Sequence, residues 1–481
     1  MGTETRAAEA KSEAGPLDKF FKITERGSNL RTEIVAGLTT FMTMAYILFV
    51  NPAILGALPD REGNELAFPL VLTVTALAAG INTLAMGLIA NYPFAIAAGL
   101  GLNAVVAFQL VGGAGLTWPE AMGVIVLEGL IIFVLVLTGF REAVMNAIPM
   151  ALKQAIGVGI GLFIAIIGFV NAGFSVSTGD PAGPALVLGR GGELVGWQVT
   201  IFVIGLLFTG VLVARRIKGA LLIGILGTTL LAIFVNEFYE GGRLYDIPGV
   251  GRIPSQVVST PDFSLVGQVD LTGSFLQIGA IAAVLAIFTI MLADFFDTMG
   301  TVIGLGGEAK FLDSQGWLPG INRVLAVDSA AAAVGGLLSA SSNTTYIESA
   351  SGISEGGRTG LTSVVVGVLF LLSLFLSPLA GVIPPQATAP ALVIVGFLMM
   401  GLVREVPWDD YDVAIPAFLT MVVMPFTYSI TNGIGAGFVA YVVIKVLRGK
   451  PGEVHWMMYV SALAFLIYFA ISGVRALLGI A

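Results

Sequence analysis

Long runs of apolar residues, separated by short polar segments, recur along most of the chain. A helix needs about 20 apolar residues to cross a lipid bilayer. Runs of about this length lie at 33–55, 68–90, 119–139, 147–171, 198–214, 219–237, 275–305, 323–340, 360–380, 387–403, 411–428, 431–447 and 456–478. The pattern predicts an all-α polytopic membrane protein.

Two further runs, 95–110 and 341–353, are too short or too polar to cross as ordinary helices. In the first, Gly99, Gly101 and Asn103 stand where a helix would begin, and the second opens with Ser, Asn and Thr. These residues favour extended chain and helix N-caps. We expect each run to form a strand followed by a half-helix, with the two half-helix N-termini facing each other near the membrane midplane.

Basic residues fall mainly in alternate loops. With a cytoplasmic N-terminus, and with each short run counted as a crossing, the inner loops carry Arg141, Arg215, Arg216, Lys218, Lys310, Arg323, Arg358, Arg404, Lys445, Arg448 and Lys450. Only scattered basic residues, such as Arg61, Arg190 and Arg243, fall outside. The positive-inside rule therefore predicts a multi-pass protein of the cell's inner (plasma) membrane, and the fit requires both short runs to change sides.

The crossings divide into two sets of seven around the loop at 239–273. Because seven is odd, the second set is inverted relative to the first, and the third crossing of each set is the short one. Inverted repeats with interrupted helices are typical of secondary transporters. The run at 456–478 is left over, and we interpret it as an extra C-terminal span.

Composition narrows the chemistry. Of 481 residues, 56% are hydrophobic and only 11% are charged, whereas soluble domains average about 25% charged. The chain has no cysteine and a single histidine, His455, which removes disulfides, thiol nucleophiles and histidine-based catalysis. Ser339–Ser342 have no accompanying base. We expect a protein that is not an enzyme and that needs no cofactor or metal.

Acidic residues interrupt one apolar run. Asp294, Asp297 and Thr301 are spaced i, i+3 and i+7, so they share one face of a helix. An ionised carboxylate at mid-bilayer depth costs about 2.5–3.5 kcal/mol. Such residues usually face a cavity, a partner or a substrate. We predict that this face and Glu348 form a solute site, although Asp294 could equally brace the helix bundle.

Two other acids are interpreted differently. Asp328 and Glu33 lie near the ends of their apolar runs, and we interpret them as packing or interface charges.

Four segments resemble the AzgA-type hypoxanthine/guanine/adenine permeases: TTFMTMAYILFVNP at 39–52, AGLGLN at 98–103, DFFDTMGT at 294–301 and NTTYIESASG at 343–352. That group is related to the nucleobase–ascorbate transporters, which include uracil and xanthine permeases. The resemblance runs from about Phe21 to the C-terminus. It implies a uracil-permease-like fold of two inverted sevens, with crossings 1–4 and 8–11 forming a core domain and crossings 5–7 and 12–14 a gate domain.

The resemblance and the apolar runs together give a domain plan. We expect a cytoplasmic tail and surface helix at 1–32, core domain at 33–140 and 274–383, gate domain at 147–238 and 384–447, an extracellular loop at 239–273, and the extra helix at 456–478.

The resemblance also implies a substrate site. The acid of the eighth crossing that binds the nucleobase corresponds to Asp297, and the second acid corresponds to Glu348. A polar residue one turn beyond the first acid corresponds to Thr301. A backbone contact falls on Gly99, Leu100 and Gly101, and the aromatic residues available to stack on the ring are Phe295, Phe296 and Tyr346. Two departures from the wider family are Ser349, where Asn is common, and the absence of a Gln-His pair in the first crossing.

The implied activity is secondary active import of purine nucleobases by proton symport with alternating access. A carboxylate can accept from two adjacent N–H groups of a purine, and Glu348 or Asp294 is expected to carry the proton. The partners are thus a purine base, protons and the lipid bilayer, with no nucleic acid. The sequence leaves open the preferred purine, sodium instead of proton coupling, and a homodimer.

Two other functions fit the sequence less well. An anion or other small-solute transporter on the same fold would need a positive charge at the tenth crossing, where Glu348 is negative. A membrane enzyme would need a nucleophile–base pair or metal cluster, and the sequence suggests neither.

Overall fold

The computed structural model describes residues 15–138, 147–178, 184–241, 243–245, 250–253, 256–312, 318–380 and 382–478. The expected tail at 1–14 lies outside this part of the chain. Within it, nine helices are long and apolar enough to cross a membrane, and four shorter apolar helices accompany them.

The first half of the chain contains the following elements: α2 (Pro16–Phe21), α3 (Leu30–Met44), α4 (Ile47–Leu55), α5 (Phe68–Ala85), η1 (Met86–Ala90), β1 (Ile96–Ala98), α6 (Leu100–Ala104), η2 (Val105–Gly113), α7 (Trp118–Thr138), α9 (Met150–Asn171), β2 (Ser175–Ser177), β3 (Leu186–Leu188), α10 (Trp197–Ala214) and α11 (Ala220–Phe238).

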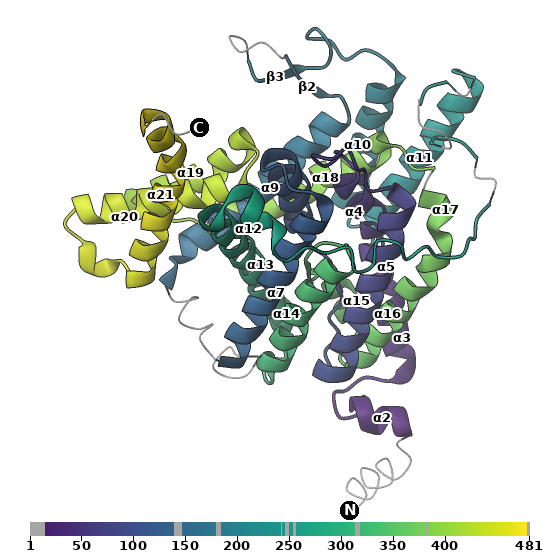
Figure 1. Ribbon diagram of the computed structural model, residues 1–481. Coiled ribbons are helices and arrows are strands. Elements are labelled where there is room, and N and C mark those ends of the chain that lie inside the picture. The colour runs from purple at the N-terminus through teal and green to yellow at the C-terminus, as the bar shows by residue number, and fades with distance from the viewer. Residues whose placement is uncertain are drawn as a thin grey trace, which may run out of the picture.

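The second half contains α12 (Gly273–Ile278), α13 (Ala280–Glu308), α14 (Ile321–Leu337), β4 (Asn343–Thr345), α15 (Ser349–Ser354), α16 (Gly360–Ser373), η3 (Leu374–Leu376), α17 (Ser377–Ala380), α18 (Pro385–Met399), η4 (Met400–Glu405), α19 (Tyr411–Thr427), α20 (Ile430–Leu447), η5 (Pro451–Glu453) and α21 (Trp456–Leu478). Their arrangement is shown in Figure 1.

The two short runs are folded as predicted, each as a strand followed by a short helix. β1 leads into α6 and the π-helical η2, and β4 leads into α15. The strands pair antiparallel, with Ile96 opposite Thr345 and Ala98 opposite Asn343. All six strand residues are buried. Irregular backbone is tolerated inside a membrane protein only where protein or a cavity surrounds it, and here each strand satisfies the other's backbone.

Two apolar runs are interrupted where the sequence pattern predicts continuous helices. The first crossing breaks at Ala45 and Tyr46, between α3 and α4. The run at 275–305 breaks at Gly279, which has a φ of 84°. This left-handed conformation is accessible to glycine at little cost and ends α12 before α13 begins.

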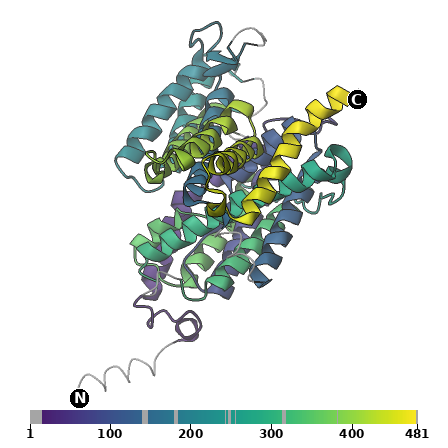
Figure 2. The ribbon, with the colours of Figure 1, turned by 90° about the vertical axis from the view of Figure 1, so that its left-hand side faces the viewer.

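The helices form two groups that pack mainly among themselves. α5, α13 and α14 contact the β1–β4 pair, α7 and α16 pack on these helices and α3 packs on α16, whereas α9, α10, α11, α18, α19 and α20 pack on one another. α21 contacts both α20 and α13 and runs along the outside of the molecule (Figure 2). The division of the chain into a core and a gate domain stays a prediction.

The linker between the two halves crosses the ends of the first helix group opposite the N-terminal side. Ser259 donates its backbone N–H to Phe375, Gly267 to Leu337 and Asp270 to Pro119, at 2.9–3.0 Å. These bonds attach the linker to η3, α14 and α7. The segment 173–197 instead forms the β2–β3 hairpin, with Ser175 opposite Leu188.

Glu33 has the structural role expected of it. Its buried carboxylate accepts from the backbone N–H groups of Arg358 and Thr359 and from the Thr362 hydroxyl, at 2.9, 3.2 and 2.6 Å. It thereby satisfies donors at the N-terminus of α16, which would otherwise be buried without partners.

A close backbone contact joins the second and eleventh crossings. A Cβ at Gly360 would overlap the backbone carbonyl of Gly87, so only glycine allows this approach. We expect Gly360→Ala to lower the free energy of unfolding by about 2 kcal/mol, because overpacking against backbone cannot relax cheaply. Denaturation of the purified protein measures this. Gly401→Ala, where a Cβ meets nothing within 4 Å, is the control, and equal stability of the two variants would contradict the prediction.

Candidate functional site

Asp297 lies in the long helix α13 but keeps an exposed side chain. Its neighbours on the helix, Phe295 and Thr298, are buried. The carboxylate interacts electrostatically with Glu348 and Asp328. An exposed acid in the middle of a buried helix indicates a polar space inside the bundle rather than a packed contact.

Glu348 approaches Asp297 from the second half-helix. It is the N-cap residue of α15 and is half-buried. The hydroxyl of Tyr46 donates to its Oε1 at 2.6 Å. Tyr46 lies in the break between α3 and α4 and interacts electrostatically with Glu348, Tyr346 and Asp297. Side chains from the first, eighth and tenth crossings therefore converge on one site.

Tyr346 is held by the strand pair. Its hydroxyl donates to the carbonyl oxygen of Ala98, at the end of β1, and the residue is buried. Phe295 packs in the main apolar core. The side chain of Phe296 lies outside the described part of the structure. Of the three aromatic candidates for stacking, Tyr346 is the one whose described contacts lie among the site residues.

The predicted backbone contact lies at the start of α6. The N–H of Gly99 donates to the Ser342 carbonyl at 2.9 Å, and Leu100 is buried. A Cβ at Gly101 would lie 2.5 Å from Cγ2 of Ile160 on α9, so this glycine permits close contact between the two helix groups. Asn103 is fully buried, and neither atom of its side-chain amide has a hydrogen-bond partner in the structure.

The remaining two predicted residues, Thr301 and Asp294, lie about one turn from Asp297 on α13. Thr301, one turn beyond Asp297, is nearly buried. Asp294 is only 1% exposed and lies within hydrogen-bonding reach of Glu128 on α7. The structure therefore brings Asp297, Glu348 and Tyr346 together. Asp294 lies with Glu128 and Asp328 in a buried cluster of acids, which we call the deeper polar layer.

Comparison with known proteins assigns the chain. A model of the Permease family matches residues 31–436. The chain belongs to this permease family. It is 41% identical to the adenine permease AdeQ of Escherichia coli (strain K12), over 94% of this chain and 96% of that protein. It is 39% identical to the guanine/hypoxanthine permease PbuG of Bacillus subtilis (strain 168), over 94% and 99%.

A solved structure supports the fold of this permease. The transmembrane domain of the cyanobacterial bicarbonate transporter BicA superposes with a TM-score of 0.57, at 14% identity, over 87% of this chain and 97% of that one. At this identity the likeness concerns the fold alone. The chain is thus a multi-pass membrane permease with the 7+7 inverted-repeat fold that the sequence predicts.

Asp328 forms part of the permease's deeper polar layer, and its position corrects the sequence interpretation. It lies in the middle of α14 rather than near a helix end. Its carboxylate accepts from the N–H and hydroxyl of Thr345, at 2.8 and 2.6 Å, and from the hydroxyl of Thr298, at 2.7 Å. It thereby joins β4 to α13 and α14.

Sequence reasoning did not single out Glu128 and Tyr46. Glu128 could have been found, since it is an acid in the middle of the apolar run at 119–139 and the cost of a membrane-buried charge applies to it as to Asp294. Tyr46 carries no such signal. Its role depends on contact with Glu348, 302 residues away.

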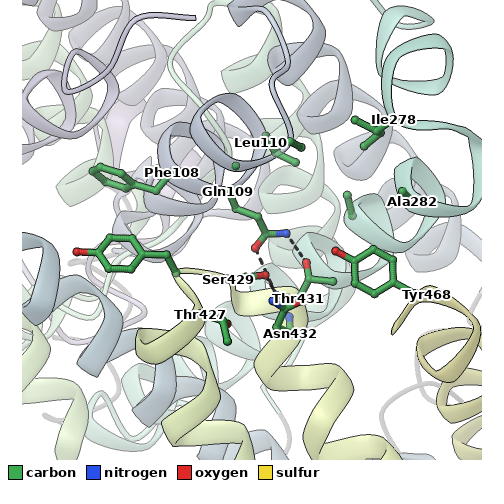
Figure 3. A pocket seen from close by; sticks show the side chains of 14 residues that line it. Phe108, Gln109, Leu110, Ile278, Ala282, Thr427, Ser429, Thr431, Asn432 and Tyr468 are labelled. Atoms are coloured by element: carbon green, nitrogen blue, oxygen red, sulfur yellow. Dashed lines mark hydrogen bonds between the residues drawn. The ribbon is translucent and has the colours of Figure 1, made fainter. Parts of the chain in front are cut away.

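A separate polar contact joins the permease's two helix groups on the side opposite the N-terminus. The Gln109 amide on η2 donates to the Thr431 hydroxyl, and its oxygen accepts from the Thr431 N–H at 3.3 Å (Figure 3). Phe108 and Tyr428 meet edge to face beside this contact. These residues line a cavity of about 400 Å³ between η2, α13, the α19–α20 turn and α21.

Proposed function

We propose that this permease imports purine nucleobases, namely hypoxanthine, guanine or adenine, by proton symport with alternating access. The convergence of Asp297 and Glu348 on one polar site carries the proposal. The names of the relatives AdeQ, an adenine permease, and PbuG, a guanine/hypoxanthine permease, support the purine class. We also propose that the protein lies in the inner (plasma) membrane with its N-terminus in the cytoplasm.

The site's hydrogen-bonding groups suit a neutral purine. A purine edge presents N–H donors beside ring-nitrogen or carbonyl acceptors, and a carboxylate accepts two adjacent N–H groups. Asp297 and Glu348 supply such acceptors from two sides. Tyr46 fixes one oxygen of Glu348, and the buried amide of Asn103 in the third crossing has both a donor and an acceptor without a partner among the described residues. A base bound here also separates two like charges that would otherwise repel each other.

An anion substrate fits the site less well. Among the described residues, the acids Asp294, Asp328 and Glu348 interact electrostatically with Asp297. An anion would be repelled by these carboxylates and would need an Arg or Lys partner. The resemblance to a bicarbonate transporter therefore extends to the fold and not to the substrate.

Reconstituted uptake tests the function. Liposomes containing the purified protein should accumulate radiolabelled hypoxanthine but neither sulfate nor bicarbonate. An inward proton gradient should increase purine accumulation without sodium, because each proton moved down 100 mV supplies about 2.3 kcal/mol. Uptake of sulfate or bicarbonate in place of purine would contradict the substrate class. Purine accumulation that needs sodium and ignores the pH gradient would contradict proton symport but not purine transport.

In this proposal the Gln109–Thr431 contact keeps the site closed on its side of the membrane. Alternating access requires contacts between core and gate to break on one side when the site opens there. We expect Gln109→Ala to favour opening on this side about fivefold, because one net hydrogen bond contributes about 1 kcal/mol. The measurement is the labelling rate of a cysteine introduced at Ala114, which lines the cavity, by an impermeant maleimide. The chain's lack of native cysteine makes the signal specific.

A matched variant controls for general loosening. Gln154 donates to Glu405 at 2.7 Å within the second helix group. Gln154→Ala also removes a glutamine hydrogen bond but leaves the contact between the groups intact. The labelling rate at position 114 should rise in Gln109→Ala and stay unchanged in Gln154→Ala. An unchanged labelling rate in Gln109→Ala would show that the contact does not keep the site closed.

A further inference from the structure

Glu128 and Asp294 form a buried pair of acids behind the purine site. Glu128 is 0% exposed and Asp294 is 1% exposed. Their carboxyl groups lie within hydrogen-bonding reach of each other. Oε1 of Glu128 and Oδ1 of Asp294 have no other hydrogen-bond partner in the described structure. The one partner that Glu128 Oε2 has is the Ser342 hydroxyl, at 3.4 Å. Two acceptor atoms are therefore buried without donors.

The charges around the pair are all negative. Asp328 from α14 acts on both acids, and Asp297 acts on Asp294 from the next turn of α13. The other elements packed on α7, namely α12 and η2, contain no titratable residue, and the linker contributes another acid, Asp270, which contacts α7 at Pro119. Two ionised carboxylates in such a place favour the binding of a cation, because their repulsion adds to the cost of burying each charge.

We propose that Glu128 and Asp294 together bind one exchangeable proton, which is the proton transported with the purine. This inference rests on the proposed symport. Binding converts one carboxylate of the pair to a carboxylic acid, whose O–H then donates to the other carboxylate. The proton comes from a hydronium ion, which becomes water, and release returns it to water. The proton supplies the donor that the two acceptor atoms lack.

The pair is connected to the purine site through short contacts. Asp294 and Asp297 are one turn apart on α13. Ser342, whose hydroxyl contacts Glu128, accepts at its carbonyl from the N–H of Gly99 at the start of α6. A proton on the pair removes one negative charge next to Asp297 and so stabilises the ionised Asp297 that accepts the purine N–H groups. Proton and purine therefore favour each other's binding, as symport requires.

The assignment differs from a role for Glu348 as proton carrier. Glu348 is half-buried and already accepts from Tyr46, so it has a donor in the absence of a transported proton. Within the described residues, Oε1 of Glu128 and Oδ1 of Asp294 have no donor. Since Glu128 comes from the fourth crossing and Asp294 from the eighth, the proton site joins the two halves of the core.

The test uses the full-length protein in liposomes and the variants Glu128→Gln and Asp294→Asn. Purine exchange is measured for each variant at equal pH on both sides, and purine accumulation is measured under a pH gradient. Proton entry with purine is detected by a pH-sensitive dye inside the liposomes. We expect accumulation to fall at least tenfold in both variants and proton entry to reach background, with purine exchange still measurable. Glu308→Gln, an exposed acid on the same helix α13, should behave as wild type.

The outcomes are separable. A folded Glu128→Gln or Asp294→Asn protein that still moves protons with purine would overturn the assignment. Loss of purine exchange in both folded variants would also overturn it, because the pair would then support the structure or the purine rather than the proton. Normal wild-type accumulation driven only by sodium would contradict proton coupling. Failure of the wild type to transport purine would contradict the proposed function itself.

Discussion

Replacing Asp297 or Glu348 with alanine should lower purine affinity at least 100-fold and leave a folded, membrane-inserted protein. A hydrogen bond to a charged group contributes about 1.5–3 kcal/mol, and each carboxylate can accept two from a purine edge. Loss of about 3 kcal/mol corresponds to about 100-fold in affinity. Binding of radiolabelled hypoxanthine to the purified variants measures the effect, and size-exclusion chromatography and thermal unfolding establish that they are folded.

Conservative variants sharpen this expectation. Asp297→Asn keeps the size of the side chain but places an N–H₂ group against the N–H of the purine, so it should reduce affinity more than its shape suggests. Glu308→Ala, at an exposed position of the same helix, should bind hypoxanthine normally. Unchanged affinity in both Asp297→Ala and Glu348→Ala would show that the site lies elsewhere.

The crossings and the two half-helices could be predicted because each depends on local pattern. Apolar length, glycine placement and the distribution of basic residues identify the third and tenth crossings without knowledge of their partners. The pairing of Ile96 with Thr345 follows once both runs are strands that meet inside the bundle. The breaks in the helices could not be predicted in this way. Gly279 and Tyr46 interrupt runs whose hydropathy is continuous.

The candidate site was predictable only in part. The acids of α13 are visible because charge in an apolar run is costly, but helix spacing does not say what lies opposite each one. Asp294 and Asp297 are one turn apart, and yet one lies against Glu128 and the other keeps an exposed side chain. That difference depends on the packing of α7 against α13, which brings together residues more than 100 positions apart in the sequence.

Asp328→Ala should destabilise the protein and abolish purine binding together. The buried carboxylate accepts three hydrogen bonds, two from Thr345 and one from Thr298. Removing it leaves the Thr345 N–H without an acceptor in the interior, and a buried unsatisfied donor costs about 1–3 kcal/mol. With the hydroxyl bonds also lost, we expect the free energy of unfolding to fall by about 3 kcal/mol. Denaturation monitored by tryptophan fluorescence measures this.

Purine binding should fail in Asp328→Ala because Asp328 positions β4, which leads directly to Tyr346 and Glu348. Asp328→Asn retains an acceptor oxygen for Thr345 and should recover most of the stability. Ser329→Ala is the matched control. Among the described residues, the buried Ser329 hydroxyl bonds only to the Leu325 carbonyl of its own helix, at 2.7 Å, so its loss should change neither stability nor binding appreciably. If Asp328→Ala unfolded at the wild-type denaturant concentration, the carboxylate would not be what holds β4 against α14, and the tenth-crossing residues would be positioned instead by the β1–β4 pairing.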